Sequence, residues 1–182
     1  MAAIVSLCWW MTLPLAVVGS LLHFLYDWTG EKRWAAVLGD VNESYWEHVK
    51  IAVWPVVLLH GVMFVLGGHR YPAFVPAATV AIYSLPVSLT GIVWLYKALT
   101  KRNILWLDIT VFAVVILLAQ FIFVQLPQQL QADRLTVALA VPYLLGILGA
   151  FWRFSLRPPS EPDVFFDPIT AEYGLKGRSH PR

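Results

Sequence analysis

The chain has 182 residues, of which 59% are hydrophobic and only 13% are charged, and its net charge is +2. A soluble domain has about 25% charged and about 45–50% apolar residues, so this composition excludes an ordinary soluble domain and indicates a polytopic membrane protein. The basic residues lie at the ends of apolar segments and near the C-terminus. That pattern is typical of membrane topology and argues against a nucleic-acid partner.

Five apolar segments are long enough to cross a bilayer, because a helical span needs about 20 apolar residues. They cover residues 3–26, 50–67, 72–96, 104–126 and 135–154. Backbone polar groups in lipid must be satisfied within their own segment, so each span should be helical. The predicted fold is an all-α bundle of five transmembrane helices in residues 1–157, followed by a cytoplasmic tail at 158–182.

The distribution of basic residues predicts the orientation of the bundle. Of the thirteen Lys and Arg residues, only Arg70 and Arg134 fall in the loops on the same side as the N-terminus. The other eleven fall on the opposite side, in the connections after the first and third spans, at helix ends and in the tail. By the positive-inside rule, the N-terminus is outside and the C-terminus is cytoplasmic.

Polar residues are concentrated in residues 40–50, Asp-Val-Asn-Glu-Ser-Tyr-Trp-Glu-His-Val-Lys, at the mouth of the second span. Polar groups in such a place are costly, and they tend to be functional or paired. His23 and Asp27 share one helical face, as Glu43 and Glu47 do, because residues four apart lie on the same side of a helix. Since consecutive spans are expected to be neighbours, these pairs should meet near the inner leaflet, with Asp108 of the fourth span at a similar level.

Three interpretations of these residues remain open. Imidazoles and carboxylates with open positions can bind zinc or iron and activate water. A carboxylate–imidazole pair can act as general acid and base, or the groups can simply neutralise one another and lock helices together. The candidate catalytic residues are Glu47, His48 and Asp108; the candidate ligands of a divalent metal are His23, Asp27 and Glu43; the further polar members are Asn42, Ser44 and Asp167.

Helix capping is the structural alternative for part of this segment. Ser44-x-x-Glu47 fits a capping box, and so does Asp40-x-x-Glu43. Capping accounts for one or two of these side chains, but it gives no reason for the nearby His23, Asp27 and His48.

Two tertiary contacts are also expected. His60 falls in the middle of the second span and should hydrogen-bond a polar side chain of another helix. Its candidate partners are Ser84, Ser88, Thr90 and Gln120. In the tail, the apolar triplet Val164-Phe165-Phe166 suggests that this part of the chain docks against the bundle.

The polar segments resemble the signature of a bacterial family of small multi-span membrane proteins of unknown function. Residues 22–30, Leu-His-Phe-Leu-Tyr-Asp-Trp-Thr-Gly, and residues 41–50 are similar to its L-H-F-x-Y-x-x-[ST]-G and V-N-E-S-x-W-E-H-x-K elements. Residues 166–174 are similar to its F-x-D-P-x-T-x-x-Y-G element, with one residue fewer before Asp167. The resemblance implies a multi-pass protein of the bacterial inner membrane, in which the first cytoplasmic loop and the tail form one site. It transfers no catalytic role.

Three functions are consistent with these features. The first is hydrolysis of a lipid or lipid-linked substrate by acid–base or metal-assisted chemistry. The alternatives are a non-enzymatic membrane scaffold or accessory protein and a small proton-coupled transporter. The lipid bilayer is the expected partner in each case, and a protein partner or a second copy of the chain remains open.

Overall fold

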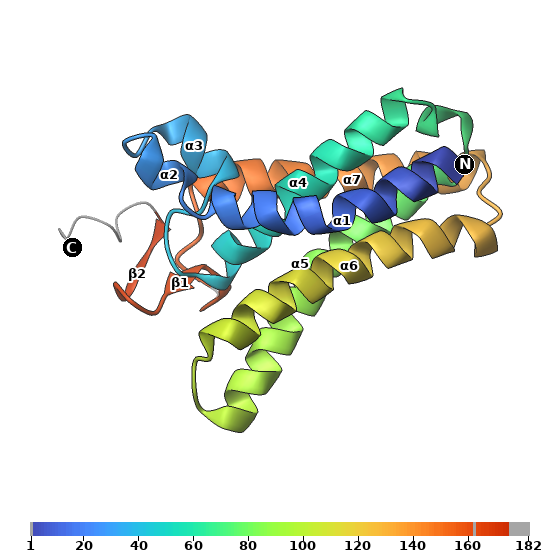
Figure 1. The fold of residues 1–182 in the computed structure, drawn as a ribbon. Helices are drawn as coiled ribbons and strands as arrows, with labels where there is room; N and C mark the ends of the chain where they lie inside the picture. The colour runs from blue at the N-terminus through green and yellow to red at the C-terminus, as the bar shows by residue number, and fades with distance from the viewer. Residues whose placement is uncertain (1, 162, 175–182) are drawn as a thin grey trace.

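The computed structural model describes residues 2–161 and 163–174, and this part of the chain is almost entirely helical (Figure 1). The elements are α1 (Ala2–Leu22), α2 (Leu25–Trp28), α3 (Arg33–Leu38), α4 (Tyr45–Val65), η1 (Gly68–Arg70), α5 (Phe74–Thr100), α6 (Leu105–Gln129), α7 (Arg134–Leu156), η2 (Asp163–Phe165), β1 (Phe166–Asp167) and β2 (Glu172–Tyr173). Helices α1, α4, α5, α6 and α7 are each long and apolar enough to cross a membrane. The prediction of an all-α protein with five candidate spans is confirmed.

The first long helix ends earlier than the apolar run in the sequence. The expected span reaches residue 26, whereas α1 stops at Leu22 and the chain turns into the separate helix α2. The carbonyl of Leu22 accepts a hydrogen bond from the backbone N–H of Asp40, 3.3 Å away. A carbonyl inside a continuing helix would instead accept from residue 26. The returning loop therefore takes part in ending α1.

Helix α4 begins five residues before the expected start of the second span, because Ser44 caps it. The Ser44 hydroxyl oxygen accepts from the backbone N–H of Glu47 at 3.4 Å, so the helix starts at Tyr45. Ser is a favoured N-cap residue because its side chain satisfies a backbone donor in the first turn. This early start places Glu47 and His48 within the first turn of α4.

The hydrophobic core lies between the five long helices, and its centre contains one polar pair. A ring nitrogen of His60 on α4 lies 3.1 Å from the Gln120 side-chain oxygen on α6, and the His60 ring stacks on Phe123 at 4.3 Å. Both polar side chains are buried. The expected hydrogen bond from His60 to another helix is confirmed, with Gln120 as the partner.

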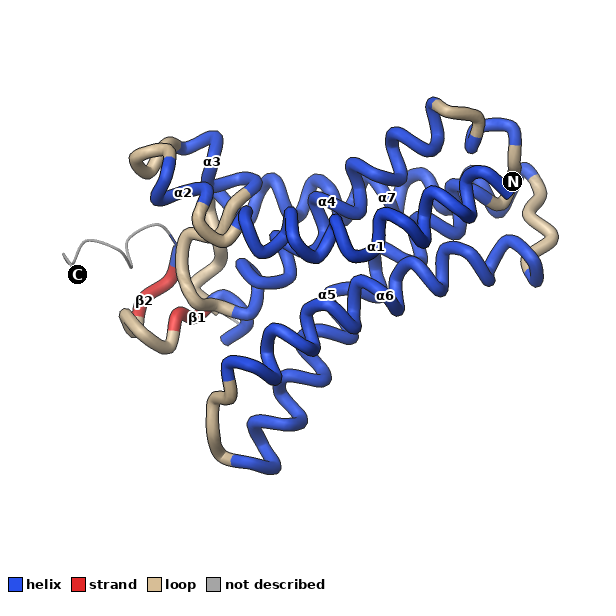
Figure 2. Tube along the Cα trace, in the orientation of Figure 1, coloured by secondary structure: helices blue, strands red, loops and turns tan. Residues whose placement is uncertain are grey.

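The two ends of the bundle differ in structure. Helices α2 and α3, the β1–β2 hairpin and the α5–α6 turn lie toward one end (Figure 1). The N-terminus, the loop that contains η1 and the α6–α7 connection lie at the other (Figure 2). The loops that carry most of the polar residues are thus gathered at the first of these ends.

The tail docks on this end of the bundle through Phe165. Its buried ring lies 4.8 Å from Trp46 of α4 and 5.5 Å from Phe154 of α7, measured between ring centroids. The Asn42 side-chain amide donates to the carbonyl of Gly174 at 3.2 Å. The expected docking of the tail is confirmed, and a hydrogen bond joins the tail to the loop before α4.

Candidate functional site

Four polar side chains from three neighbouring segments converge beside the end of α1. His23 follows the last residue of α1, Asp40 and Glu43 lie on the loop before α4, and His48 lies in the first turn of α4. Gly39 allows this loop to return so closely. A Cβ at this position would lie 2.8 Å from the carbonyl oxygen of Leu22, closer than real Cβ contacts come.

The Glu43 carboxylate lies between two imidazole rings. Its Oε1 is 3.8 Å from Nε2 of His23, and its Oε2 is 3.5 Å from Nε2 of His48. The two rings are 5.6 Å apart between centroids. The structure therefore brings together His23, Glu43 and His48, three residues that the sequence analysis singled out.

The other ring nitrogen of each imidazole also has a close partner. Nδ1 of His48 lies 2.9 Å from the carbonyl oxygen of Ser44. A carbonyl can only accept, so the proton is assigned to Nδ1, and Nε2 of the neutral ring keeps its lone pair. Nδ1 of His23 lies 2.5 Å from Oδ2 of the fully buried Asp40. This oxygen has no hydrogen-bond partner among the described residues, so its contact with Nδ1 of His23 is a close ion-pair contact rather than an aligned hydrogen bond. In its neutral form, the His48 ring therefore presents an unprotonated Nε2 to Glu43.

Successive polar contacts hold the loop that carries Glu43. Oδ1 of Asp40 accepts from the backbone N–H of Asn42 at 2.9 Å, and Oδ1 of Asn42 accepts from the backbone N–H of Ser44 at 3.0 Å. Asp and Asn side chains commonly stabilise turns by such bonds two residues along the chain. Asn42 and Ser44 are buried and support the site rather than line it.

Glu47 belongs to a buried ion pair behind this loop. Its Oε2 accepts from Nζ of Lys50 at 2.5 Å and from the backbone N–H of Val41 at 3.0 Å, and Nζ of Lys50 also donates to the carbonyl of Ala36 at 2.6 Å. Of the two expected capping boxes, the one at Ser44 forms only in part, because the Glu47 carboxylate bonds to Val41 and Lys50. Asp40 starts no helix. The enclosed Glu47 is suited to holding the loop on α4 and α3.

In the described chain, the ligand atoms of His23, Asp40 and His48 lie within 4.8 Å of one another, and Glu43 is not part of this group. Three further candidates, Asp27, Asp108 and Asp167, do not belong to it either. Asp27 is exposed on α2. Asp108, in the first turn of α6, accepts a hydrogen bond from the Tyr96 hydroxyl of α5.

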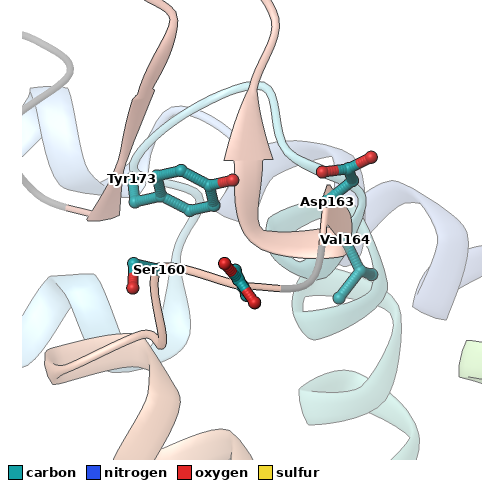
Figure 3. Close-up of a pocket in the computed structure, with 5 residues that line it drawn as sticks. Ser160, Asp163, Val164 and Tyr173 are labelled. Carbon is teal, nitrogen blue, oxygen red and sulfur yellow. The ribbon is translucent and has the colours of Figure 1, made fainter.

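Asp167, the third, closes the turn between β1 and β2. It accepts from the backbone N–H of Ile169 at 2.9 Å and from the Thr170 hydroxyl at 2.7 Å. A separate open groove of about 770 Å³ lies beside the tail (Figure 3). It is lined by Ser160, Glu161, Asp163, Val164 and Tyr173. Because it contains no imidazole, it offers poorer ligands for a transition metal than the His23–His48 group.

The sequence predicts only a helix-capping role for Asp40, and its contact with His23 was not predicted. The sole local signal was its position two residues before Asn42, which favours a turn. The contact itself depends on the loop returning to the end of α1.

Comparison with known families gives one result. Residues 4–175 match the sequence model of a family described as Family of unknown function (DUF6512). Comparison with curated proteins and with solved structures gives no match. The match covers every residue of the site described above.

Proposed function

This chain belongs to the family of unknown function DUF6512, and from the geometry of its site we propose that it is an integral membrane protein that binds a divalent transition metal through His23, Glu43 and His48. Two imidazoles and one carboxylate with open positions suit zinc and iron(II). In this proposal His48 is a ligand in place of Asp27, and Asp40 supports His23.

The spacing of Glu43 from the two imidazoles carries the proposal. The separations of 3.8 and 3.5 Å between its oxygens and the Nε2 atoms exceed the usual 2.7–3.2 Å of an N–H···O hydrogen bond. Two ligand atoms, each about 2.0–2.1 Å from one tetrahedral ion, are about 3.4 Å apart. Because a different Glu43 oxygen faces each ring, this carboxylate would bind a shared ion through both of its oxygens.

The atoms behind the two rings support the same assignment. Imidazoles that bind metals nearly always donate their second N–H to a carboxylate or a backbone carbonyl, which fixes the ring orientation. Asp40 stands at Nδ1 of His23 and the Ser44 carbonyl at Nδ1 of His48. His48 therefore has an orienting partner of a kind that metal sites use, and the Asp40 carboxylate lies beside Nδ1 of His23.

The site is open enough to admit a substrate. The side chains of His23, Glu43 and His48 are 28%, 35% and 36% exposed. A bound divalent ion would supply a Lewis acid that activates water for hydrolysis. His23 and His48 would bind the ion, while Asp40 and the Glu47–Lys50 pair hold the rings and the loop in place. Because the site lies at the ends of candidate spans, we infer that it hydrolyses a lipid or lipid-linked substrate.

The orientation of the chain is part of the proposal. Eleven of its thirteen basic residues fall on the side of the site in the topology drawn from the sequence. The positive-inside rule then puts the site on the cytoplasmic face and the N-terminus outside. The similarity of residues 41–50 to a bacterial signature supports the bacterial inner membrane as the location.

A membrane scaffold is the second candidate, and the docked tail favours it. Phe165 and Gly174 hold the tail against the same end of the bundle, through Trp46 and Asn42. The tail and the loop together could present a surface to a partner protein. This function requires no metal, so metal analysis separates the two candidates.

Metal content provides the test. The protein is purified in detergent, stripped with a chelator, reloaded with zinc or iron(II) under anaerobic conditions, and analysed by mass spectrometry of the metal. We expect about one ion per chain and at least a tenfold loss of affinity in Glu43→Gln and His48→Ala. The control is His69→Ala, because the His69 side chain lies in η1 and is exposed. Two results would contradict the proposal: a wild-type chain that binds no metal, or site variants that bind metal as tightly as the control. Either result would favour the membrane scaffold instead.

A further inference from the structure

The segment between His23 and Asp40, here called the wing (residues 24–39), is a loop rooted at the proposed metal site. Its ends are joined by the 2.5 Å contact between Nδ1 of His23 and Oδ2 of Asp40, and by the backbone hydrogen bond from Asp40 to Leu22. Helices α2 and α3 form most of it and project from one end of the bundle (Figure 1). The root of the wing therefore lies beside His23.

The inner face of the wing is fixed to the rest of the protein. Tyr26, Ala35 and Ala36 are buried in a small cluster of their own. The carbonyl of Val37 accepts from the indole N–H of Trp54 at 2.7 Å, and that of Ala36 accepts from Lys50. Helices of four and six residues are not stable alone, so these contacts hold the wing in shape.

The outer face of the wing exposes large aromatic side chains. Phe24, Trp28 and Trp34 are 47%, 65% and 54% exposed, and Phe24 stacks on Trp28 at 5.7 Å. Lys32 and Arg33 are exposed between them in sequence. Aromatic side chains together with Lys or Arg are characteristic of elements that lie at the boundary between lipid headgroups and acyl chains.

The end of α7 extends this surface, because α3 packs against α7. It adds the exposed Trp152, Arg153 and Arg157. Residues 24–39 and 152–157 together contain four basic and two acidic residues, an excess of two positive charges. Basic residues near a membrane surface are attracted to anionic lipids, so the surface suits an anionic headgroup layer.

We propose that the wing lies in the headgroup layer and binds an anionic phospholipid, whose headgroup it presents to the site formed by His23, Glu43 and His48. The proposal rests on the proposed function for the role of that site. The Phe24 ring lies edge-on to His23 at 5.0 Å and continues into Trp28. Apolar surface for acyl chains thus begins beside a proposed ligand, and the substrate is an amphiphile whose polar head reaches the site.

The depth of the wing can be measured by spin labelling in vesicles of equimolar phosphatidylglycerol and phosphatidylcholine. In a Cys8→Ala background, single labels replace Trp28, Trp34 or, as a water-exposed control, Ser160. We expect labels at 28 and 34 to collide more with oxygen, which concentrates in lipid, and the label at 160 to collide more with a water-soluble nickel chelate. Labels at 28 and 34 that behave like the one at 160 would overturn the proposal.

Lipid preference gives the second measurement. The variant Lys32→Gln/Arg33→Gln is compared with wild type for its association with spin-labelled phosphatidylglycerol relative to phosphatidylcholine. We expect the preference for the anionic lipid to fall by up to about fivefold per charge removed, with metal content unchanged. An unchanged preference would overturn anionic lipid binding. Loss of metal from the wild type would contradict the proposed function instead, so the two failures are distinguishable.

Discussion

Replacing Lys50 by Met tests the buried ion pair that anchors the site's loop. Lys50 is completely buried, and its Nζ lies 2.5 Å from Oε2 of Glu47 and 2.6 Å from the carbonyl of Ala36. In the variant, the buried Glu47 carboxylate keeps only the backbone N–H of Val41 among the donors described here. The Glu47 carboxyl group then lacks its counter-ion in surroundings that exclude water.

The expected cost follows from the burial of both partners. Removing one member of a buried ion pair destabilises a protein by about 3–5 kcal/mol, because the remaining charge is uncompensated. The double variant Lys50→Met/Glu47→Gln carries neither charge, and the amide oxygen introduced at position 47 could still accept from Val41. Replacing both members of a buried pair with neutral groups of similar size is often close to neutral. We therefore expect the double variant to recover most of the lost free energy of unfolding.

Equilibrium unfolding in mixed detergent micelles, followed by tryptophan fluorescence, measures both variants. Lys101→Met is the matched control, since Lys101 is exposed after the end of α5. Two results would refute the reasoning. One is a loss below about 1 kcal/mol in Lys50→Met, the size of an exposed pair. The other is a double variant as unstable as the single one, which would make side-chain shape rather than charge responsible.

Four further outcomes are expected. Asp40→Asn should weaken metal binding about 10–100-fold, because it alters the partner that orients His23; titration with zinc measures this, and unchanged affinity would contradict the supporting role. Wild-type affinity should be lower in acid, because protons compete with the metal ion for its ligands; a flat profile would argue against the proposed ligand set. Phe165→Ala should release the tail at a cost of about 3–5 kcal/mol, seen as faster proteolysis after residue 157; unchanged cleavage would show that docking does not depend on this ring. Hydrogen bonds from the Thr136 hydroxyl and backbone N–H lower the pKa of Asp133 at the start of α7. The contribution of Asp133 to stability is therefore present above the ordinary carboxyl pKa and lost as the pH falls through the lowered value. In Asp133→Ala, amide hydrogen exchange at residues 134–137 should be faster near neutral pH. An unchanged exchange rate would contradict this.

The five candidate spans could be read from the sequence because each is a long apolar run, and lipid requires such a run to be helical. The end of α1 could not be read in the same way. The apolar pattern continues past Leu22, but the carbonyl of Leu22 bonds to Asp40. Contacts between residues so far apart along the chain leave no local pattern.

The same non-local contact limited the prediction of the site. The convergence of His23 with Glu43 and His48 follows from the order of the spans and could be anticipated. The pairing of His23 with Asp27 assumed one continuous helix, whereas Asp27 lies on the separate helix α2. Asp40 lies beside His23 only because the loop returns to the end of α1. A helical or strand periodicity in the sequence cannot predict such a return.

X-ray absorption spectroscopy of the zinc-loaded protein measures the proposed ligand set most directly. We predict nitrogen and oxygen neighbours at about 2.0–2.2 Å with the scattering pattern of two imidazoles, one of which disappears in His48→Ala. The only cysteine, Cys8, is buried in α1, so no sulfur neighbour is expected. A sulfur neighbour at about 2.3 Å, or an ion surrounded by oxygen alone, would contradict a site built from His23, Glu43 and His48.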